Sequence, residues 1–286
     1  PLWATLNEPW VVMDAGYMHG VQPPGHRSLA EAPRVSHNLL RAHGAAVEAF
    51  RSEGRGAIGL VLNLEPKIPA TDSPEDLAAA RRADAYMNRQ FLEPVFLGRY
   101  PEELAEIFGE DWPDFPAQDL RRIAAPIDWL GINYYTSSVT RHDPSVPPLR
   151  ASRLHQRGIL TTEMGWEVRP ESLTRLLLGV QERCGGIPLY ITENGAAFAD
   201  PPTAPPHGVE DPLRREYFRE HLRAAHEAMR QGVNLRGYFA WSLLDNVEWA
   251  EGTTKRFGLV HVDFATLKRV IKESGLFYRE VIRTRG

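Results

Sequence analysis

Two glutamates in this sequence could together break a glycosidic bond. Glu8 lies in the motif LNEP (residues 6–9), and Glu193 lies in the motif ITENG (residues 191–195). Each glutamate ends a short apolar run typical of a β-strand and is followed at once by a turn residue. Hydrolysis of a glycosidic bond needs two such carboxyl groups, one on each side of the anomeric carbon. Either motif alone is more often a capping or surface carboxylate in a turn, because short motifs recur by chance, so only the pair indicates catalysis.

A shared site would give the two carboxylates different tasks. In hydrolysis with retention one carboxylate is the nucleophile, and the other acts first as acid and then as base. Their carboxyl groups must then lie about 5–5.5 Å apart. Glu8 and Glu193 are far apart in the sequence, so only the fold can bring them together.

The sequence predicts five β-strands that alternate with helices. Apolar runs with little polar alternation, typical of strands covered on both faces, occur at residues 2–7, 57–64, 128–135, 187–193 and 236–242. Strands that alternate with helices indicate βα units and a parallel sheet. The carboxyl ends of parallel strands meet at one edge of the sheet. We therefore expect Glu8 and Glu193 at the same edge.

Helices are predicted from periodic apolar residues and from capping signals. Ser73 is a predicted cap before Pro74, and Pro170 and the pair Asp211-Pro212 open two further helices. A helix before the second strand carries Val35, Leu39, Ala46, Val47 and Phe50, and the last helix is expected to carry Leu267, Val270, Ile271, Phe277 and Val281.

Five βα units in series predict one α/β domain over residues 1–286. A (β/α)8 TIM barrel needs eight strands. We interpret the five units as strands four to eight of such a barrel, a partial barrel whose strands one to three are not in this sequence. The proline-rich stretches 143–148 and 200–206 each follow a strand, where barrel enzymes build their sites. Either stretch is equally compatible with a tolerated surface insertion.

Composition excludes several classes of function. The net charge is −4 and acidic and basic residues are interleaved, which argues against nucleic-acid and membrane partners. The ten histidines are scattered and no metal motif or glycine-rich phosphate loop is present, so no metal or cofactor is expected. The single cysteine, Cys184, excludes an internal disulfide, fits a reducing and hence cytoplasmic compartment, and is expected to serve only in packing.

Together, the two glutamate motifs resemble the acid/base and nucleophile motifs of glycoside hydrolase family 1, the retaining β-glucosidase family. The resemblance runs from Trp3 to about Val281. It implies a TIM barrel that hydrolyses terminal, non-reducing β-D-glucosyl residues, with Glu8 as acid/base and Glu193 as nucleophile. We expect the charge of Glu193 to raise the pKa of Glu8 and keep Glu8 protonated until the glycosyl ester forms.

Further residues are similar to substrate-binding residues of that family. Asn7 resembles the asparagine that binds the sugar 2-hydroxyl. In the run DWLGINYY (residues 128–135), the resemblance implies that Tyr135 hydrogen-bonds the nucleophile and that Asn133 helps line the pocket. Trp166 resembles the tryptophan that lines the aglycone subsite. Taken singly, these side chains are also compatible with strand capping, barrel packing or a hydrophobic anchor under a loop.

The run WSLLDNVEW (residues 241–249) resembles the end of the family's eighth strand. The resemblance implies that Trp241 stacks under the pyranose ring, that Glu248 accepts hydrogen bonds from the 4- and 6-hydroxyls, and that Trp249 donates one. A carboxylate at Glu248 argues against 6-phosphorylated sugars, because two anions repel each other in a dry pocket. The expected ligand is a β-glucoside or a short β-linked oligosaccharide. Galactosides and fucosides, transglycosylation, and the identity of the aglycone all stay open.

Two hypotheses about the chain follow. Family members carry further sugar-binding groups on strands one to three, and none of these can be assigned here. In the first hypothesis, a companion segment with those strands, or a homo-oligomer, completes a β-glucosidase. In the second, the chain is a catalytically inactive remnant that self-associates or binds a partner. Both predict that the 286 residues alone are not a well-formed monomer with full activity, because open parallel edges invite association.

Overall fold

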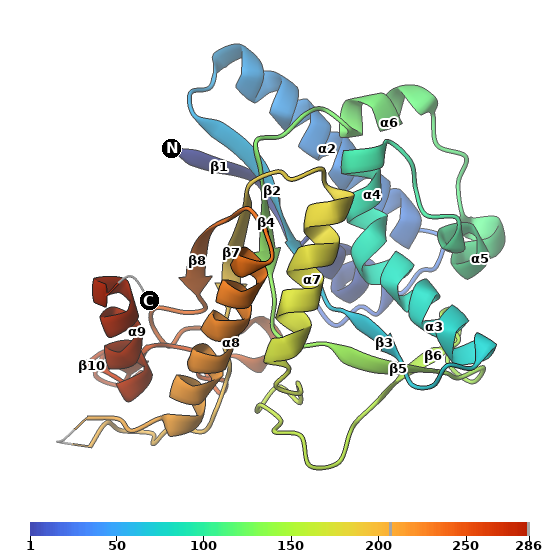
Figure 1. Cartoon of the computed structure of the whole chain (residues 1–286). Helices are drawn as coiled ribbons and strands as arrows, with labels where there is room; N and C mark the ends of the chain where they lie inside the picture. Colours follow the sequence, from blue (N-terminus) through green and yellow to red (C-terminus); the bar gives the residue numbers. More distant parts are fainter. Residues whose placement is uncertain (206–207, 285–286) are drawn as a thin grey trace.

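A computed structural model of the chain, which describes residues 1–205 and 208–284, is built around one parallel β-sheet (Figure 1). Its strands are, in spatial order, β1 (Leu2–Asn7), β2 (Ala57–Asn63), β4 (Trp129–Asn133), β7 (Leu189–Asn194) and β8 (Leu235–Ala240). Every pair of neighbours in this sheet is parallel. The five predicted strands are therefore confirmed, with bounds that differ by no more than two residues.

Helices that connect the strands pack on one side of the sheet (Figure 1). The main ones are α2 (Ala32–Glu53), α3 (Pro74–Asp84), α4 (Gln90–Leu97), α6 (Ala117–Ile123), α7 (Pro170–Arg183) and α8 (Pro212–Arg230). The predicted cap of α3 is confirmed, because the Asp76 N–H donates to Ser73 Oγ at 3.2 Å. Cys184 caps the end of α7 and is buried in the core, as expected for a packing residue.

The hydrophobic core lies between this sheet and the helices. It contains alternate residues of the three central strands, namely Leu60, Leu62, Leu130, Ile132, Leu189 and Ile191, all buried. On the opposite face of the sheet, Trp129 packs edge-on against Tyr190, with ring centroids 5.5 Å apart. A β-carbon at Gly59 would lie 2.4 Å from Trp129, and one at Gly237 would lie 2.7 Å from Tyr190. These two glycines therefore make the room that the aromatic rings occupy.

The loops at the carboxyl ends of the strands add two small sheets. One contains β3 (Lys67–Pro69), β5 (Ser138–His142) and β6 (Ala151–Leu154), and the other pairs β9 (Val260–Val262) with β10 (Arg269–Ile271). The predicted stretch 143–148 lies in the turn between β5 and β6. The stretch 200–205 lies between β7 and α8, and residue 206 lies outside the described residues.

The prediction for the last helix is wrong at its beginning. Helix α9 (Glu273–Thr284) starts after Leu267, Val270 and Ile271, and the last two of these lie in β10. The cause is a turn at Asp263, whose Oδ1 accepts the Ala265 N–H at 2.9 Å and so starts a hairpin instead of a helix. Five short elements were also not predicted, because they are too short for a periodic pattern: α1 (Pro9–Met13), η1 (Asp14–Met18), α5 (Glu103–Phe108), η3 (Gly109–Asp111) and η4 (Trp249–Glu251). The helical turn η2 (Ala85–Arg89) joins α3 to α4 without a break.

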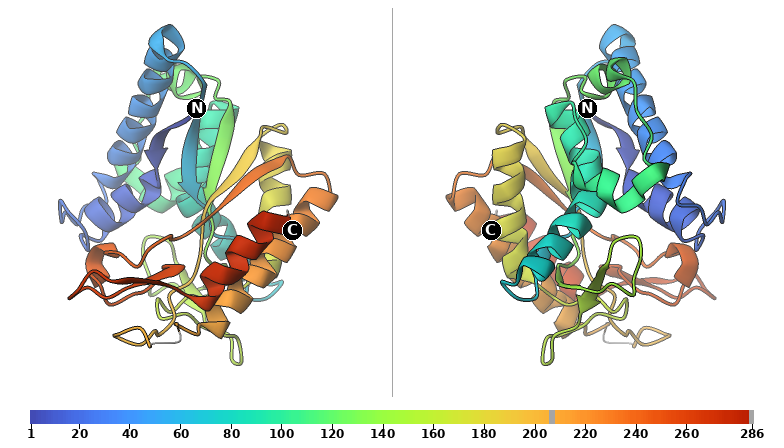
Figure 2. Two further views of the ribbon diagram at one scale, coloured as in Figure 1. Left: turned by 90° about the vertical axis from the view of Figure 1, so that its left-hand side faces the viewer. Right: turned by 90° about the vertical axis from the view of Figure 1, so that its right-hand side faces the viewer.

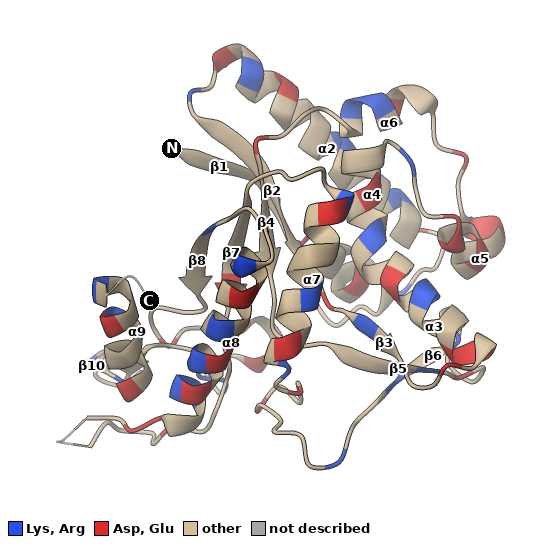
Figure 3. Cartoon of the chain, viewed as in Figure 1, with Lys and Arg blue, Asp and Glu red and all other residues tan. Residues whose placement is uncertain are grey.

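The sheet has two outer strands, β1 and β8, and the strands fan out between them (Figure 2). The expectation that strands are covered on both faces holds for β2 and β4, which are almost wholly buried. It is wrong for the outer strands, where Trp3 is 54% exposed and Phe239 is 55% exposed. Residues of both charges alternate along α7 and α8 (Figure 3). Among the described helices, none has the length and apolar character needed to cross a membrane.

Candidate active site

The predicted functional residues gather at the carboxyl ends of the five parallel strands. Glu8 follows β1, Asn133 ends β4, Glu193 is the penultimate residue of β7, and Trp241 follows β8. Asn133 and Glu193 are paired in the register of their neighbouring strands. Across β1 and β2, the Glu8 N–H donates to the Val61 carbonyl at 3.0 Å. The sheet therefore brings both glutamates to one edge, as the sequence predicts.

The backbone at Glu8 adopts an unusual conformation. Its φ is 47° and its ψ is 55°, in the left-handed region that non-glycine residues rarely occupy. Such a conformation costs about 1–3 kcal/mol and persists only where the surroundings enforce it. Here the chain turns from β1 directly into α1, which begins with Pro9. The strained backbone is therefore at the junction of β1 and α1, which sets the direction of the Glu8 side chain.

The side-chain amide of Asn133 joins the two motifs. Its Nδ2 donates to Glu8 Oε1 at 2.7 Å and to Asn7 Oδ1 at 3.0 Å. Its Oδ1 accepts a hydrogen bond from Thr192 Oγ1 at 2.6 Å. An amide offers donors only on nitrogen and acceptors only on oxygen, so these contacts fix which way the Asn133 amide faces. Thr192, which precedes Glu193, therefore helps to orient the partner of Glu8.

Glu193 is held by a tyrosine. The Tyr135 hydroxyl donates to Glu193 Oε2 at 2.6 Å, and burial beside two carboxylates raises the pKa of Tyr135 well above 10, so its proton stays in place. Burial also raises the pKa of Glu193, an effect opposed by hydrogen bonds from the side chains of Tyr135, Asn133 and Asn7. These donors favour the ionised form of Glu193, which a nucleophile requires.

The pKa of Glu8 is raised close to neutral. Burial, above all, raises the pKa of Glu8 from 4.5 to about 7, and the charge of Glu193 adds to the effect. The hydrogen bond from Asn133 lowers it in part. The sequence-based expectation was right in direction but named the smaller cause, because desolvation at the strand end outweighs the charge of Glu193. A carboxyl group with a pKa near 7 can exchange its proton at neutral pH, as a general acid and base must.

A cavity of about 440 Å³ opens beside Glu8. Trp166 and Tyr135, whose ring centroids are 5.1 Å apart, form part of its wall. Another part of the wall is charged: Lys67 Nζ lies 2.7 Å and Arg153 Nη2 lies 2.6 Å from Glu65 Oε1. These two cations hold the pKa of the buried Glu65 carboxyl down at about 2, against the effect of burial. The cavity thus combines aromatic surface with hydrogen-bond donors.

Residues 241–249 follow β8 and pass the end of β7, where the Trp241 N–H donates to the Asn194 carbonyl at 2.8 Å. The negative charge of Glu248 raises the pKa of both Glu8 and Glu193, which places it within electrostatic reach of both. Burial raises the pKa of Glu248 itself, and a hydrogen bond from the Trp241 side chain opposes this effect. Trp249 begins the short helix η4 and is 78% exposed. The structure therefore groups Trp241 and Glu248 with the glutamates and leaves Trp249 at the surface.

Sequence reasoning missed several residues of this region. Thr192 lies inside a motif that had been singled out, so its position offered a signal. Glu65 and Lys67 lie just before and at the start of β3, and Arg153 lies in β6, far along the chain, so no local sequence pattern indicates that they meet. Tyr217 of α8 also reaches the site only through the tertiary fold. Its hydroxyl accepts a hydrogen bond from Asn194 Nδ2 at 3.0 Å and donates one to the Tyr135 carbonyl at 3.2 Å. Among the residues that the structure describes, no group of three or more side chains is suited to bind a metal ion.

A parallel α/β sheet with two acidic side chains at its carboxyl edge and a cavity beside them is the arrangement found in part of a (β/α) barrel. Comparison with protein families matches residues 1–286 to "Glycosyl hydrolase family 1". The chain belongs to this family. The resemblance seen in the sequence is thereby confirmed.

Relatives and solved structures agree with this assignment. Beta-glucosidase A of Thermotoga maritima is 43% identical over 286 residues, which are 99% of this chain and 64% of the relative. A beta-glucosidase of Agrobacterium sp. is 42% identical, over 96% of this chain and 60% of the relative. The structure of a family 1 b-glucosidase from Thermotoga maritima superposes with a TM-score of 0.95 and 43% identity, over 99% of this chain and 64% of that one. The chain thus matches the fold of these relatives while spanning 60–64% of their length.

Proposed function

We propose that this chain carries the catalytic carboxyl groups of a retaining β-glycosidase that is β-glucosidase-like and acts on terminal, non-reducing β-D-glucosyl residues. The observation that carries the proposal is the unequal setting of two adjacent glutamates. Glu8 has a pKa raised to about 7, mainly by burial, whereas Glu193 accepts a 2.6 Å hydrogen bond from Tyr135. This is the division that separates an acid from a nucleophile.

In the first step, the Glu193 carboxylate attacks the anomeric carbon, and the bond from that carbon to the glycosidic oxygen breaks. Glu8 gives its proton to the departing oxygen, so the leaving group departs as an alcohol. Formation of the glycosyl ester removes the charge of Glu193, one of the causes that raise the pKa of Glu8. Glu8 is then ionised more readily and can take a proton from water, whose oxygen attacks the anomeric carbon and releases Glu193.

The lining of the site supports a neutral sugar with an aromatic or saccharide leaving group. On the sugar side, Trp241 offers a stacking surface and Glu248 offers acceptors for hydroxyl groups, as the family resemblance implies. On the side of the leaving group, Trp166 lines the 440 Å³ cavity together with the donors Lys67 and Arg153. A structure of a beta-glucosidase from Thermotoga maritima contains deoxynojirimycin, and a structure of a Thermotoga maritima family 1 glycoside hydrolase contains a cyclophellitol analogue. We extend such glucoside-like ligands to this chain as part of the proposal.

A second candidate function rests on the exposed sheet edges. Trp3 on β1 and Phe239 on β8 are each more than half exposed. Exposed apolar edges favour association with a companion segment, with another copy of the chain, or with a partner. A catalytically inactive, self-associating protein would share this feature with an enzyme that needs a companion segment.

The configuration of the first product tests the proposed reaction. NMR of an aryl β-glucoside reaction, recorded before mutarotation, should show the β-anomer first; early α-anomer would contradict the assignment. In the Glu193→Ala variant most of the rate should be lost, and added azide should restore part of it as an α-glycosyl azide. Rescue by azide requires a glycoside bound beside the space that Glu193 leaves, and a catalytically inactive protein does not bind one there, so rescue separates the two candidates.

A further inference from the structure

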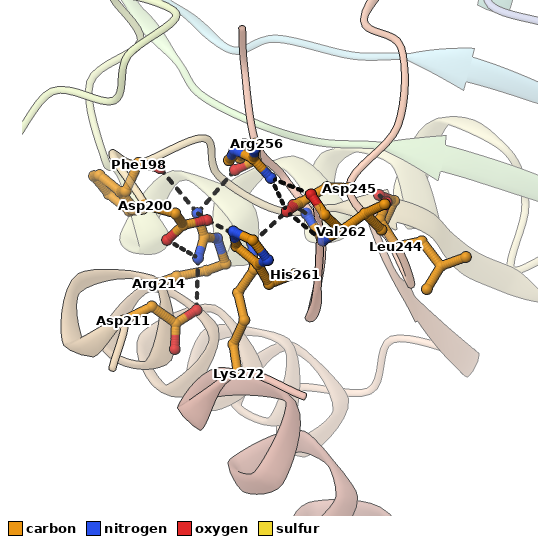
Figure 4. A network of polar contacts seen from close by, with 12 residues as sticks. Phe198, Asp200, Asp211, Arg214, Leu244, Asp245, Arg256, His261, Val262 and Lys272 are labelled. Atoms are coloured by element: carbon orange, nitrogen blue, oxygen red, sulfur yellow. Dashed lines mark hydrogen bonds and ion pairs between the residues drawn. The ribbon is translucent and has the colours of Figure 1, made fainter. Parts of the chain in front are cut away.

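A buried network of charges lies behind the segment 241–249 (Figure 4). Its members are Asp200, Asp211, Arg214, Asp245, Arg256 and Lys272. The side chains of Asp200, Arg214 and Lys272 have no solvent exposure, and that of Asp245 has 1%. Three cations face three carboxylates, so the network is neutral as a whole. Such neutrality is what makes burial of six charges tolerable.

Asp245 ties segment 241–249 to the chain that follows it. Its Oδ1 accepts from the Gly258 N–H at 2.9 Å and its Oδ2 accepts from the Val262 N–H at 3.2 Å. Arg256 Nη1 lies 2.7 Å from the same Oδ2. Gly258 is needed here, because a β-carbon would lie 2.2 Å from the Asp245 nitrogen. The carboxylate of Asp245 thus accepts hydrogen bonds from two backbone N–H groups and from the guanidinium group of Arg256.

Asp200 lies in the second segment that the network joins, the loop that follows Glu193 and β7. Arg214 holds it with two hydrogen bonds of 3.1 Å, and also donates at 3.1 Å to the carbonyls of Ala196 and Phe198 in the same loop. These bonds fix the loop after β7 to helix α8. Because the guanidinium group is planar and donates in fixed directions, these bonds fix the orientation of the loop relative to α8.

Lys272 joins the two sides. Its Nζ lies 2.5 Å from Asp200 Oδ2 and 2.8 Å from Asp245 Oδ1. Burial and the nearby Arg214 lower the pKa of Lys272, while the two carboxylates oppose this change. One ammonium group therefore connects the loop after the nucleophile strand to the segment that carries Trp241 and Glu248.

We propose that Lys272 is a positioning residue, whose ammonium group, held between Asp200 and Asp245, sets segment 241–249 at the correct place beside Glu193 for binding a neutral sugar. This inference rests on the proposed function for its sugar ligand. Lys272 does not touch the reacting atoms. It acts through the segment, which is also paired to later residues by the bonds from Asp245 N–H to the Val260 carbonyl (3.0 Å) and from Glu248 N–H to the Gly252 carbonyl (2.7 Å).

The test uses a charge-balanced pair of substitutions in the full chain. Lys272→Met alone leaves one excess negative charge in the network and destabilises the protein. The double variant Lys272→Met/Asp200→Asn removes one charge of each sign and leaves the contacts of Asp245 with Arg256, Gly258 and Val262 in place. The matched control is Glu93→Gln/Arg183→Met, which removes a pair at 2.6 Å between the outer helices α4 and α7.

Two readouts separate positioning from general stability. In the double variant, amide hydrogen exchange across residues 241–249 should accelerate by about tenfold or more, whereas exchange in β2 and β4 should match that of the control. The dissociation constant for deoxynojirimycin, measured by calorimetry, should rise about tenfold. Unchanged exchange in 241–249 would overturn the inference, and so would faster exchange with an unchanged dissociation constant. If the parent chain binds no deoxynojirimycin, either alone or with a companion segment, the proposed function fails, and the exchange data alone decide on Lys272.

Discussion

The Tyr135 hydroxyl donates to Glu193 Oε2 over 2.6 Å, and this bond lowers the pKa of the carboxyl group that burial raises. Tyr135→Phe removes the donor with little change in shape. We expect kcat/KM to fall roughly ten- to a hundredfold, because a hydrogen bond to a charged group contributes about 1.5–3 kcal/mol. The acidic limb of the pH profile should also move to higher pH, since Glu193 must be ionised. A profile that loses height without this shift would assign Tyr135 to packing alone.

The raised pKa of Glu8 predicts a cost in stability. Between pH 4.5 and about 7 the folded protein keeps a proton that the unfolded chain has lost, so the free energy of unfolding falls as pH rises through this window. The cost at pH 8 is about 3 kcal/mol. Glu8→Gln should therefore be more stable than the parent at pH 8 and similar to it at pH 4, as measured by urea denaturation. The exposed Glu53→Gln is the control, and equal stability of Glu8→Gln and parent at pH 8 would refute the burial argument.

Loss of the acid should affect substrates unequally. Glu8→Ala removes the proton donor, so poor leaving groups such as alkyl alcohols should react at least about a hundredfold more slowly, whereas dinitrophenyl glucosides, which leave without a proton, should be affected far less in the first step. Pre-steady-state release of the phenol measures this step directly. A uniform loss across a series of leaving groups would remove Glu8 from the acid role.

These three predictions concern residues that could be named before the fold was known: local patterns indicated the two glutamates, and the family resemblance implied the role of Tyr135. Glu8, Glu193, Asn133 and Tyr135 sit at strand ends that short apolar runs mark clearly, and parallel pairing then brings them together. The hairpin at Asp263 was missed, because a single Asx turn replaced a helix that periodicity favoured. The sequence also could not show which cause of the raised Glu8 pKa is larger. Burial raises this pKa more than the charge of Glu193 does, and burial depends on the tertiary fold.

Contacts between distant loops lay outside the reach of sequence reasoning. Lys272, Asp200 and Asp245 are ordinary charged residues in the chain, and only packing excludes water from all three. The same is true of Glu65 and Arg153 in the cavity wall. A charged side chain is expected at the surface unless paired, so a buried network becomes visible only with the fold.

Glu248 predicts discrimination against phosphorylated sugars. A 6-phosphate placed near this carboxylate would meet a like charge in a partly buried site, at a cost of about 4 kcal/mol at 4 Å for an effective dielectric constant of 20. We expect kcat/KM for an aryl β-glucoside to exceed that for its 6-phosphate by at least about a hundredfold. Glu248→Gln should narrow this ratio. A preference of the parent chain for the phosphorylated substrate would contradict the role given to Glu248.

The outer strands predict how the 286 residues behave by themselves. Trp3 on β1 and Phe239 on β8 are 54% and 55% exposed, on strands with only one neighbour each in the sheet. We expect association in sedimentation experiments and low turnover of an aryl β-glucoside, because unpaired edges and apolar side chains favour contact with other chains.

Trp3→Lys/Phe239→Lys should reduce association, since lysine blocks edge pairing, whereas Val21→Lys, at a residue 63% exposed and away from the sheet, should not. A companion segment that pairs with β1 or β8 should raise turnover and suppress association together, which an inactive self-associating protein would not do. A compact monomer with full turnover from these residues alone would show that neither edge needs a partner.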